Sequence, residues 1–418
     1  MILYSPKIVI LYENRFMKKQ AYIIDGIRTA IGNFGGTLSP VRADDLAAHA
    51  IKGLLDRHSD LDFSKVEDVI LGCANQAGED NRNVARMAGL LAGLPPSVPG
   101  ETVNRLCASG MAAVIHASRA IYSDSGDLFI AGGVEHMTRG PWVISKTSKA
   151  FGRDAQMHDS SFGWRFINQK LHDAYGTDGM GVTAENLVEK YNISRKDQDA
   201  FALWSQQKTK AAQEAGFFMD EIVPVEIPRR KMEPLTFDID EFPRGNTTLE
   251  SLNGLRPAFK KEGTVTAGNS SGLNDGAAAL LIASNSAIEA NNLNPLARIV
   301  SSAVAGVEPR IMGIGPVAAS QKALERAGLS LEDMDILELN EAFSAQVLAC
   351  TRMLGIQDDD PRINPNGGAI SLGHPLGMSG SRILLTAARQ LNRTNKRYAL
   401  VTMCIGVGQG YATILEKA

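Results

Sequence analysis

Cysteine is scarce in this sequence. Its 418 residues include four cysteines, Cys73, Cys107, Cys350 and Cys404, and no two of them form a C-x-x-C pair. This spacing argues against a zinc ribbon or a small disulfide framework, and a chain of this length needs no disulfides to hold its cores together. No metal site is indicated. Any one of these cysteines, taken alone, is expected to be a small buried hydrophobic residue.

Long apolar runs and a strong charge of one sign are also missing. No stretch approaches the ~20 consecutive apolar residues of a membrane helix, and the formal net charge is −3. Neither a membrane nor a nucleic acid is therefore expected as a partner. No targeting signal is recognisable, which favours a cytoplasmic protein. In residues 1–16 a short apolar stretch is interrupted by Pro6 and Lys7, and we expect an extension outside a fold that begins near Met17.

Nucleotide-binding motifs are absent as well. The chain has no G-x-x-x-x-G-K-[ST] segment. Gly406, Gly408 and Gly410 are followed by YATILEK, a β-like run, whereas a dinucleotide fingerprint must open a helix. A backbone N–H at Gly406 that faces a reactive centre explains this stretch better.

Strand-like apolar runs alternate with helical patterns along the chain, which predicts an α/β protein. Residues from about 140 to 265 are richer in Trp, Phe, Met and charge, and we interpret them as an insertion. The first strand signals cover residues 21–24, 68–71 and 128–131, and the first helical patterns cover 44–55, 83–91, 110–122, 183–191 and 195–215.

The two ends of the chain resemble each other. The first contains DVILG, NRLCASGMAAVIHASRAI and DLFIAGG, and the second contains DILELNEAF, GHPLGMSGSRILLTAAR and RYALVTMCIG. Each series reads as a strand, a small-residue turn into a helix, and a strand into a glycine turn. Two similar halves about a pseudo-twofold axis are one interpretation, and two unrelated segments with similar turn residues are the alternative.

Cys107 is the first candidate for catalysis. Ala108, Ser109 and Gly110 allow a tight turn after it, and the apolar periodicity that follows predicts a helix. Exposed N–H groups and the dipole at a helix N-terminus stabilise a thiolate, so we expect a lowered pKa and a nucleophilic role. A buried structural cysteine remains the alternative.

Three further residues stand in unusual contexts. His374 lies in the glycine-dense segment NPNGGAISLGHPLGMSGSRI, where Pro375 keeps it extended and so many glycines indicate backbone shaped around a ligand or a catalytic group. Cys404 ends a strand in VTMCIGVGQG. Asn340, in LELNEAFSAQ, either caps the next helix or orients a water or an oxyanion, and the pattern leaves both open.

Taken together, several segments in chain order resemble the signatures of the thiolase family across about 17–418. They are NRLCASG, MGVTAEN, VTAGNSSGLNDGAAA, NEAF, GGAISLGHPLGMSGSR and CIGVGQG. The resemblance implies a thiolase fold, in which two duplicated halves form a layered α-β-α-β-α core and an inserted loop domain covers the CoA site. The halves would be 17–139 with 266–291, and 292–418, around an insertion at 140–265.

The resemblance also implies the catalytic roles. Cys107 matches the nucleophile that becomes acylated, and His374 matches its base. Cys404 matches the second cysteine, which carries protons to and from carbon or the CoA sulfur. Asn340 matches the residue that holds a water which, with His374, forms one oxyanion hole. The N–H groups of Cys107 and Gly406 match the other hole.

Coenzyme A is implied as a co-substrate, with no tightly bound cofactor, and acyl-CoA as the other ligand. By resemblance Ser271 lies near the pantetheine of CoA and Arg244 near its nucleotide. Met180, Ala342 and Phe343 line the acyl end of the site. The family further implies a homodimer or a homotetramer.

Longer stretches resemble the 3-oxoadipyl-CoA (β-ketoadipyl-CoA) thiolases of aromatic-compound catabolism, which yield succinyl-CoA and acetyl-CoA. They are GCANQAGEDNRNVARMAGLLAGLP, FGWRFIN, AGVEPRIMGIGP and RYALVTMCIGVGQG. A substrate that ends in a carboxylate needs a cation near the acyl pocket. The candidates are Arg82, Arg86 and Arg165, each of which is alternatively a surface residue.

The sequence departs from that group at several positions. Gly179-Met180-Gly181 is more similar to acetoacetyl-CoA acetyltransferases, His136 and Thr138 replace serines, and Ala108 replaces a glycine. An acetoacetyl-CoA acetyltransferase or a broader 3-ketoacyl-CoA thiolase is therefore the alternative. A non-catalytic acyl-CoA or lipid-binding relative is disfavoured, because all three expected catalytic side chains are present.

Overall fold

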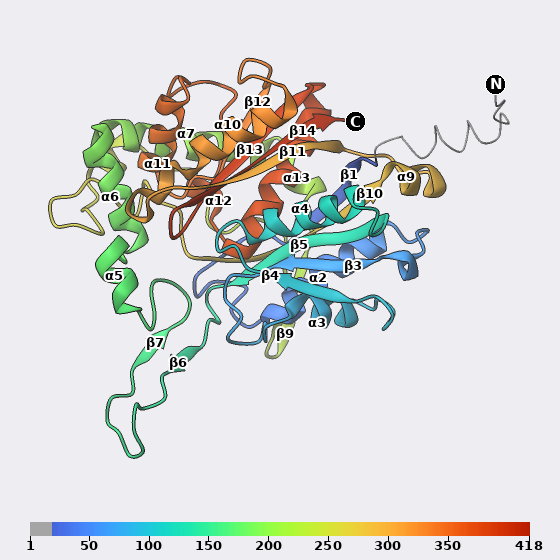
Figure 1. The fold of residues 1–418 in the computed structure, drawn as a ribbon, viewed down its shortest axis with the longest axis horizontal. Coiled ribbons are helices and arrows are strands. Elements are labelled where there is room, and N and C mark those ends of the chain that lie inside the picture. Colours follow the sequence, from blue (N-terminus) through green and yellow to red (C-terminus); the bar gives the residue numbers. More distant parts are fainter. Residues whose placement is uncertain (1–18) are drawn as a thin grey trace, which may run out of the picture.

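The structure, a computed structural model, describes residues 19–418, so the predicted extension at 1–16 lies outside the described residues. A ten-stranded sheet runs through the molecule in the order β12-β13-β14-β11-β1-β10-β5-β3-β4, with β2 paired to β10 (Figure 1). The strands are β1 (Ala21–Arg28), β2 (Gly32–Asn33), β3 (Asp68–Gly72), β4 (Gly100–Val103), β5 (Leu128–His136), β10 (Asn274–Ser284), β11 (Ala297–Gly306), β12 (Ile336–Leu339), β13 (Tyr398–Ile405) and β14 (Gln409–Lys417).

The sheet consists of two halves with the same pairing. In the first, β1 is antiparallel to β10, β10 is antiparallel to β5, and β5, β3 and β4 are parallel. In the second, β11, β14 and β13 repeat the antiparallel pairs, β13 is parallel to β12, and a parallel bridge from Leu337 to Ile363 stands where β4 would be. The halves join where Tyr22 and Ile23 of β1 pair with β11. The duplicated α/β fold predicted from the sequence is confirmed.

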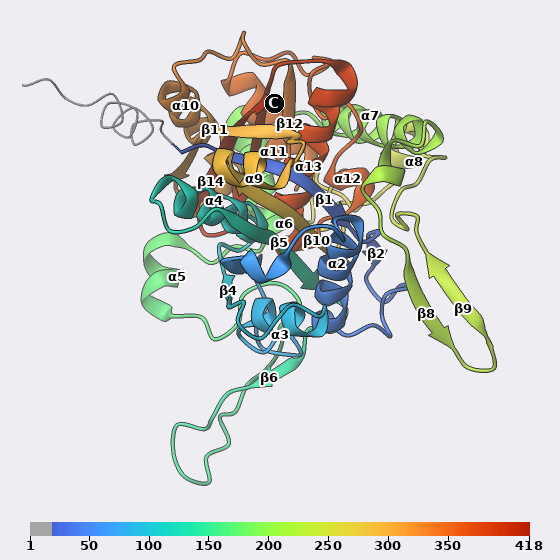
Figure 2. The ribbon, with the colours of Figure 1, turned by 90° about the vertical axis from the view of Figure 1, so that its right-hand side faces the viewer.

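Helices separate and cover the halves. Between them lie α4 (Ser109–Tyr122) and α13 (Leu376–Thr394), which pack on each other and on strands of the sheet (Figure 2). α2 (Ala43–Arg57) covers the outer face of the first half, and α10 (Gly315–Ala327) that of the second. The remaining helices are α3 (Val84–Leu91), α5 (Gln169–Tyr175), α6 (Met180–Tyr191), α7 (Arg195–Glu214), α8 (Leu249–Asn253), α9 (Asn285–Asn291), α11 (Ser344–Met353) and α12 (Ala369–Leu372).

Strand β10 shows why these sequences form a buried sheet. Because successive side chains of a strand point to opposite faces, Leu280 and Ile282 enter the core that contains α4 and α13, whereas Leu281 and Ala283 enter the core beneath α2. A strand buried on both faces reads as a continuous apolar run instead of an alternating one. The apolar stretch in β10 and the similar one in β5 are therefore products of the layered packing.

The segment 140–265 carries two hairpins that project from the body (Figures 1 and 2). One pairs β6 (Trp142–Ile144) with β7 (Met157–Asp159), and the other pairs β8 (Val225–Arg229) with β9 (Met232–Phe237). Val225, Ile227 and Phe237 of the second hairpin are buried in the core of the first half. Among the described residues, no helix combines the length and apolar character needed to cross a membrane.

Candidate active site

Cys107 lies in a strained turn between β4 and α4. Leu106, directly before it, has φ 47°, a conformation that costs energy for a residue with a side chain. Side chains hold this turn: Asn104 Oδ1 accepts a hydrogen bond from the Leu106 N–H at 2.9 Å, and Ser109 Oγ donates to the Leu106 carbonyl at 2.6 Å. Local polar contacts therefore fix the position of the Cys107 backbone.

The Cys107 residue is partly buried, and this corrects one expectation. Burial raises its pKa to about 11, although backbone N–H groups of Gly406 and of Cys107 itself donate to the sulfur and act in the opposite direction. We predicted a lowered pKa at a helix N-terminus, but desolvation outweighs the favourable dipoles. The resting residue is a neutral thiol that faces two backbone donors.

His374 lies between α12 and α13 and is held in one tautomer. Its Nδ1 is 2.6 Å from Ser379 Oγ, and that hydroxyl donates its single proton to the Pro375 carbonyl at 2.8 Å. Ser379 can therefore only accept from His374, so the proton sits on Nδ1 and the lone pair on Nε2. Burial lowers the pKa of His374 to about 3, with a contribution from the charge of Arg382. The imidazole is a neutral base.

Asn340 follows β12 and faces the same imidazole. Its Nδ2 is 3.4 Å from His374 Nε2, and its backbone N–H donates to the Thr402 carbonyl at 3.0 Å. The side-chain oxygen of Asn340 is buried and accepts no hydrogen bond from residues 19–418. A polar atom left in this state is typical of a ligand site. The next residue, Glu341, accepts hydrogen bonds from Asn364, Ser205 and Ile370 and thereby fixes this loop.

Cys404 near the end of β13 belongs to the same neighbourhood. Burial raises the pKa of its thiol, and the negative charge of a Cys107 thiolate raises it further. Cys404 packs in one apolar cluster with Met180, Ala342 and Phe343, the residues predicted for the acyl end.

Gly406 brings the loop after β13 against the nucleophile. A β-carbon at this position would lie 3.3 Å from Leu106 Cδ1 and 3.8 Å from the sulfur of Met180. The Gly406 N–H also acts to lower the pKa of Cys107, which indicates that it faces the sulfur.

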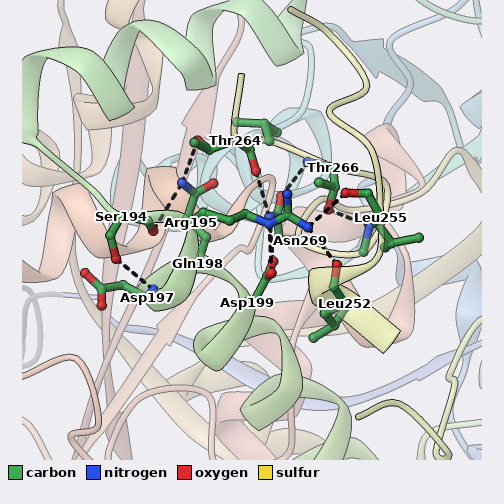
Figure 3. Close-up of polar contacts among 12 residues, drawn as sticks. Ser194, Arg195, Asp197, Gln198, Asp199, Leu252, Leu255, Thr264, Thr266 and Asn269 are labelled. Atoms are coloured by element: carbon green, nitrogen blue, oxygen red, sulfur yellow. Dashed lines mark hydrogen bonds and ion pairs between the residues drawn. The ribbon is translucent and has the colours of Figure 1, made fainter. Parts of the chain in front are cut away.

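Ser271 lies on a segment that polar contacts hold in place. Its N–H donates to the Ala342 carbonyl at 3.0 Å. Nearby, the amide of Asn269 donates to Asp199 of α7 at 3.0 Å and accepts from the Thr266 N–H at 2.8 Å, and Arg195 donates to Asp199 at 2.7 Å (Figure 3). This network ties α7 to the segment that carries Ser271.

The arginines predicted to contact CoA or the substrate carboxylate differ in the contacts that their guanidinium groups make within the protein. Arg244 is exposed, and its guanidinium lies 5.8 Å from the ring centre of Phe242. Arg86 donates to the backbone carbonyls of Val98 and Pro96, which indicates a structural role. Arg165 is half-buried and donates to one carbonyl, that of Ser160, at 3.1 Å, while Arg82 is exposed.

Three functional neighbours were missed from the sequence: Ser379, Asn274 and Glu135. Asn274 accepts from the His374 N–H at 2.9 Å, and Glu135 accepts from three backbone N–H groups close to the site. A hydroxyl five residues after the histidine was a usable signal, as was the single carboxylate in the apolar run LFIAGGVE. Within residues 19–418, no group of three or more His, Cys, Asp or Glu side chains is arranged to hold a metal ion.

Comparison with known proteins identifies the family to which this fold and site belong. The family described as "Thiolase, N-terminal domain" matches residues 21–286, and "Thiolase, C-terminal domain" matches residues 293–417. The chain therefore belongs to the thiolase family, a family of acyltransferases.

Its relatives include proteins of defined substrate. The 3-oxoadipyl-CoA/3-oxo-5,6-dehydrosuberyl-CoA thiolase of Escherichia coli (strain K12) is 59% identical over 96% of this chain and 100% of its own length. A beta-ketoadipyl-CoA thiolase of Acinetobacter baylyi is 57% identical, with the same 96% and 100% coverage. The crystal structure of human mitochondrial 3-ketoacyl-CoA thiolase in complex with CoA is similar with a TM-score of 0.88 at 41% identity, covering 96% of this chain and 99% of that one.

Proposed function

We propose that this chain is a CoA-dependent thiolase that cleaves 3-oxoadipyl-CoA into succinyl-CoA and acetyl-CoA through an acyl-enzyme on Cys107. The observation that carries the proposal is that Gly406 lies against Leu106, the residue before Cys107, and that Cys107 is near enough to Cys404 for the charge of its thiolate to raise the pKa of Cys404. A cysteine is suited to this chemistry because the acyl group must be held as a thioester and passed to another thiol. The relatives named for the same substrate supply the choice of acyl chain.

The first half of the reaction forms the acyl-enzyme. The Cys107 sulfur attacks the 3-oxo carbon while its proton passes to Nε2 of His374, since neither group is charged at rest. The N–H groups of Cys107 and Gly406 stabilise the tetrahedral alkoxide. Breaking the C2–C3 bond leaves the succinyl group on Cys107 and an acetyl-CoA enolate, whose oxygen is stabilised by His374 and by a water that Asn340 holds. Cys404 then donates its proton to C2, and acetyl-CoA leaves.

The second half transfers the succinyl group to CoA. The Cys404 thiolate takes the proton of the incoming CoA thiol, and the CoA sulfur attacks the thioester on Cys107. The same pair of N–H groups stabilises the second tetrahedral intermediate. Its collapse releases succinyl-CoA, and the Cys107 thiolate recovers its proton from His374, which restores both neutral groups.

We also propose that residues 140–265 cover the bound CoA between halves made of 17–139 with 266–291 and of 292–418. Ser271 and Arg244 would then contact the pantetheine and the nucleotide. The hydrogen-bonded network around Asn269 supports this assignment, because it holds the Ser271 segment between α7 and Ala342. For the distal carboxylate of the substrate we favour Arg165 over Arg86, whose guanidinium is occupied by two carbonyls.

A homodimer or homotetramer is proposed as the assembly. The hairpin of β6 and β7 supports it, because Trp142 and Ile144 are 69% and 66% exposed and a large apolar surface of this kind marks an interaction site. Light scattering on the purified protein tests the assembly, and a monomeric mass would contradict it.

Kinetics with two substrates tests the function. We expect kcat/KM in thiolysis to be higher for 3-oxoadipyl-CoA than for acetoacetyl-CoA, and a strong preference for acetoacetyl-CoA would overturn the acyl assignment. Mass spectrometry should detect an acyl adduct on Cys107 that the Cys107→Ala variant lacks. The Cys404→Ala variant should still be acylated by acetyl-CoA but fail in the carbon-bond step.

A further inference from the structure

Glu135 is a buried carboxylate that the mechanism above does not use. It lies near the end of β5, is 2% exposed, and forms no ion pair with any residue in 19–418. Three backbone N–H groups donate to it instead: Asn75 to Oε1 at 2.9 Å, and Ala74 and Gly377 to Oε2 at 3.0 and 2.8 Å. A buried carboxylate with several such donors is ordered by them and orders them in return.

One of the three donors lies in the first turn of α13, the helix that follows His374 and Pro375. Gly377 is the second residue of α13, and neither Pro375 at its N-cap position nor any other residue of that helix supplies a side-chain cap. Glu135 thus performs from β5 the task of an N-cap, because its carboxyl oxygen accepts from the free N–H of Gly377 at the positive end of the helix dipole. Because His374 directly precedes this helix and Ser379 lies in its first turn, the start of α13 sets the position of the imidazole.

The other two donors are connected by hydrogen bonds to the turn that carries Cys107. Ala74 and Asn75 lie in the loop after β3, and the Ala74 carbonyl accepts from Asn104 Nδ2 at 2.9 Å. The same Asn104 side chain accepts from the N–H of Leu106, the strained residue before Cys107. A continuous series of hydrogen bonds therefore runs from Glu135 to the turn that presents the sulfur.

We propose that Glu135 is a positioning residue that fixes His374 and Cys107 relative to each other, through α13 on one side and through Ala74 and Asn104 on the other. The inference rests on the proposed function for its reaction, but its geometry depends on no particular acyl chain. Misplacement of reacting groups by about 1 Å can cost on the order of 100-fold in rate.

Glu135→Gln tests the proposal with an isosteric change. Glutamine has one oxygen in place of two, so at least one of the three N–H groups would face an NH2 group. We expect kcat to fall about tenfold or more while KM for CoA stays unchanged, because the CoA-contacting residues are not touched. Alkylation of Cys107 by iodoacetamide, which requires no substrate, should slow by a similar factor when the rates are compared at equal thiolate fraction, because loss of the Glu135 charge by itself lowers the pKa of Cys107. This second readout separates the positioning role from any error in the proposed substrate.

Glu221→Gln is the matched control. Glu221 is also fully buried, but it pairs with Arg28 at 3.1 Å and meets α13 at Thr386, beyond the first turn that holds Ser379, so its replacement should lower Tm without slowing alkylation. The exposed Asn104 provides a second test that does not threaten folding. Asn104→Asp keeps the acceptor for Leu106 but loses the donor to Ala74, whereas Asn104→Ala loses both, so alkylation should slow progressively in that order. Wild-type alkylation rates in Glu135→Gln, or in Asn104→Ala, would overturn the proposal.

Discussion

Gly110 of α4 lies directly against the backbone carbonyl of Gly377 of α13: a β-carbon at Gly110 would be 2.5 Å from that oxygen. Gly133 of β5 faces the same carbonyl even more closely. The two helices approach each other at their N-terminal ends, directly after Cys107 and His374 respectively. Because these glycines have no side chains, the segments that carry the proposed nucleophile Cys107 and the proposed base His374, which are far apart in sequence, can pack closely together.

Gly110→Ala should consequently destabilise the protein and reduce activity. Alanine ordinarily favours a helix interior by ~1 kcal/mol over glycine, but overpacking a tight contact costs ~1–3 kcal/mol and here the obstacle is backbone. Gly89→Ala in α3 is the matched control, because its β-carbon would meet Leu94 and Val69 at an ordinary 3.5 Å. Thermal denaturation should show a lower Tm for the first variant and an equal or higher Tm for the second. Equal Tm values would contradict the close-packing explanation.

Ser379→Ala should lower kcat with little change in stability. The substitution removes the oxygen that keeps the His374 proton on Nδ1, so a fraction of the imidazole would adopt the tautomer that cannot accept the Cys107 proton. We expect kcat to fall about 10–100-fold, less than the ~100–10,000-fold of a complete loss of general-base catalysis, because only a fraction of the imidazole changes tautomer. Ser381→Ala, on the same helix, removes a similar hydroxyl that bonds to the Met378 carbonyl and does not contact His374. Steady-state kinetics should show a lower kcat for Ser379→Ala and an unchanged kcat for Ser381→Ala.

Because Cys107 and His374 are both neutral at rest, the rate of Cys107 alkylation should depend on pH. With the pKa of Cys107 at about 11 and that of His374 at about 3, thiolate is a minor species at neutral pH. Alkylation of Cys107 by iodoacetamide should therefore rise about tenfold per pH unit across the neutral range, in proportion to the thiolate. Peptide mass spectrometry would separate Cys107 from the other cysteines. A rate that is already flat from mildly acidic pH would instead indicate a preformed thiolate–imidazolium pair.

The sequence was informative where local pattern determines structure. The apolar runs at 68–71 and 128–131 mark β3 and β5, and the glycine-rich motif around His374 marks the loop of the proposed base. It was uninformative where distant residues determine the outcome. The pKa of Cys107 is set by burial beneath other segments, and the contacts of Glu135 come from residues 74, 75 and 377. The hairpins at 142–159 and 225–237 were missed because their strands are short and mostly exposed, without a strong apolar alternation.

Asp68 at the start of β3 should make the protein less stable as the pH rises. Burial, with the nearby charge of Glu101, raises its pKa to about 6, above the 3.8 of an unfolded chain. The folded state thus retains a proton that the unfolded state releases, so this stabilisation is complete below pH ~4 and is lost as the pH rises through about 6. Since the group is half-exposed, solvent screening reduces the effect to on the order of 1 kcal/mol.

Asp68→Asn removes that titration and should raise Tm at pH ~8 while changing little at pH ~4, where the wild-type carboxyl is already neutral. Glu101→Gln should produce a smaller gain in the same direction, because the charge of Glu101 is the lesser of the two causes. Differential scanning calorimetry at the two pH values gives the comparison. A gain in Tm that is the same at both would mean that packing, and not the ionisation of Asp68, accounts for the change.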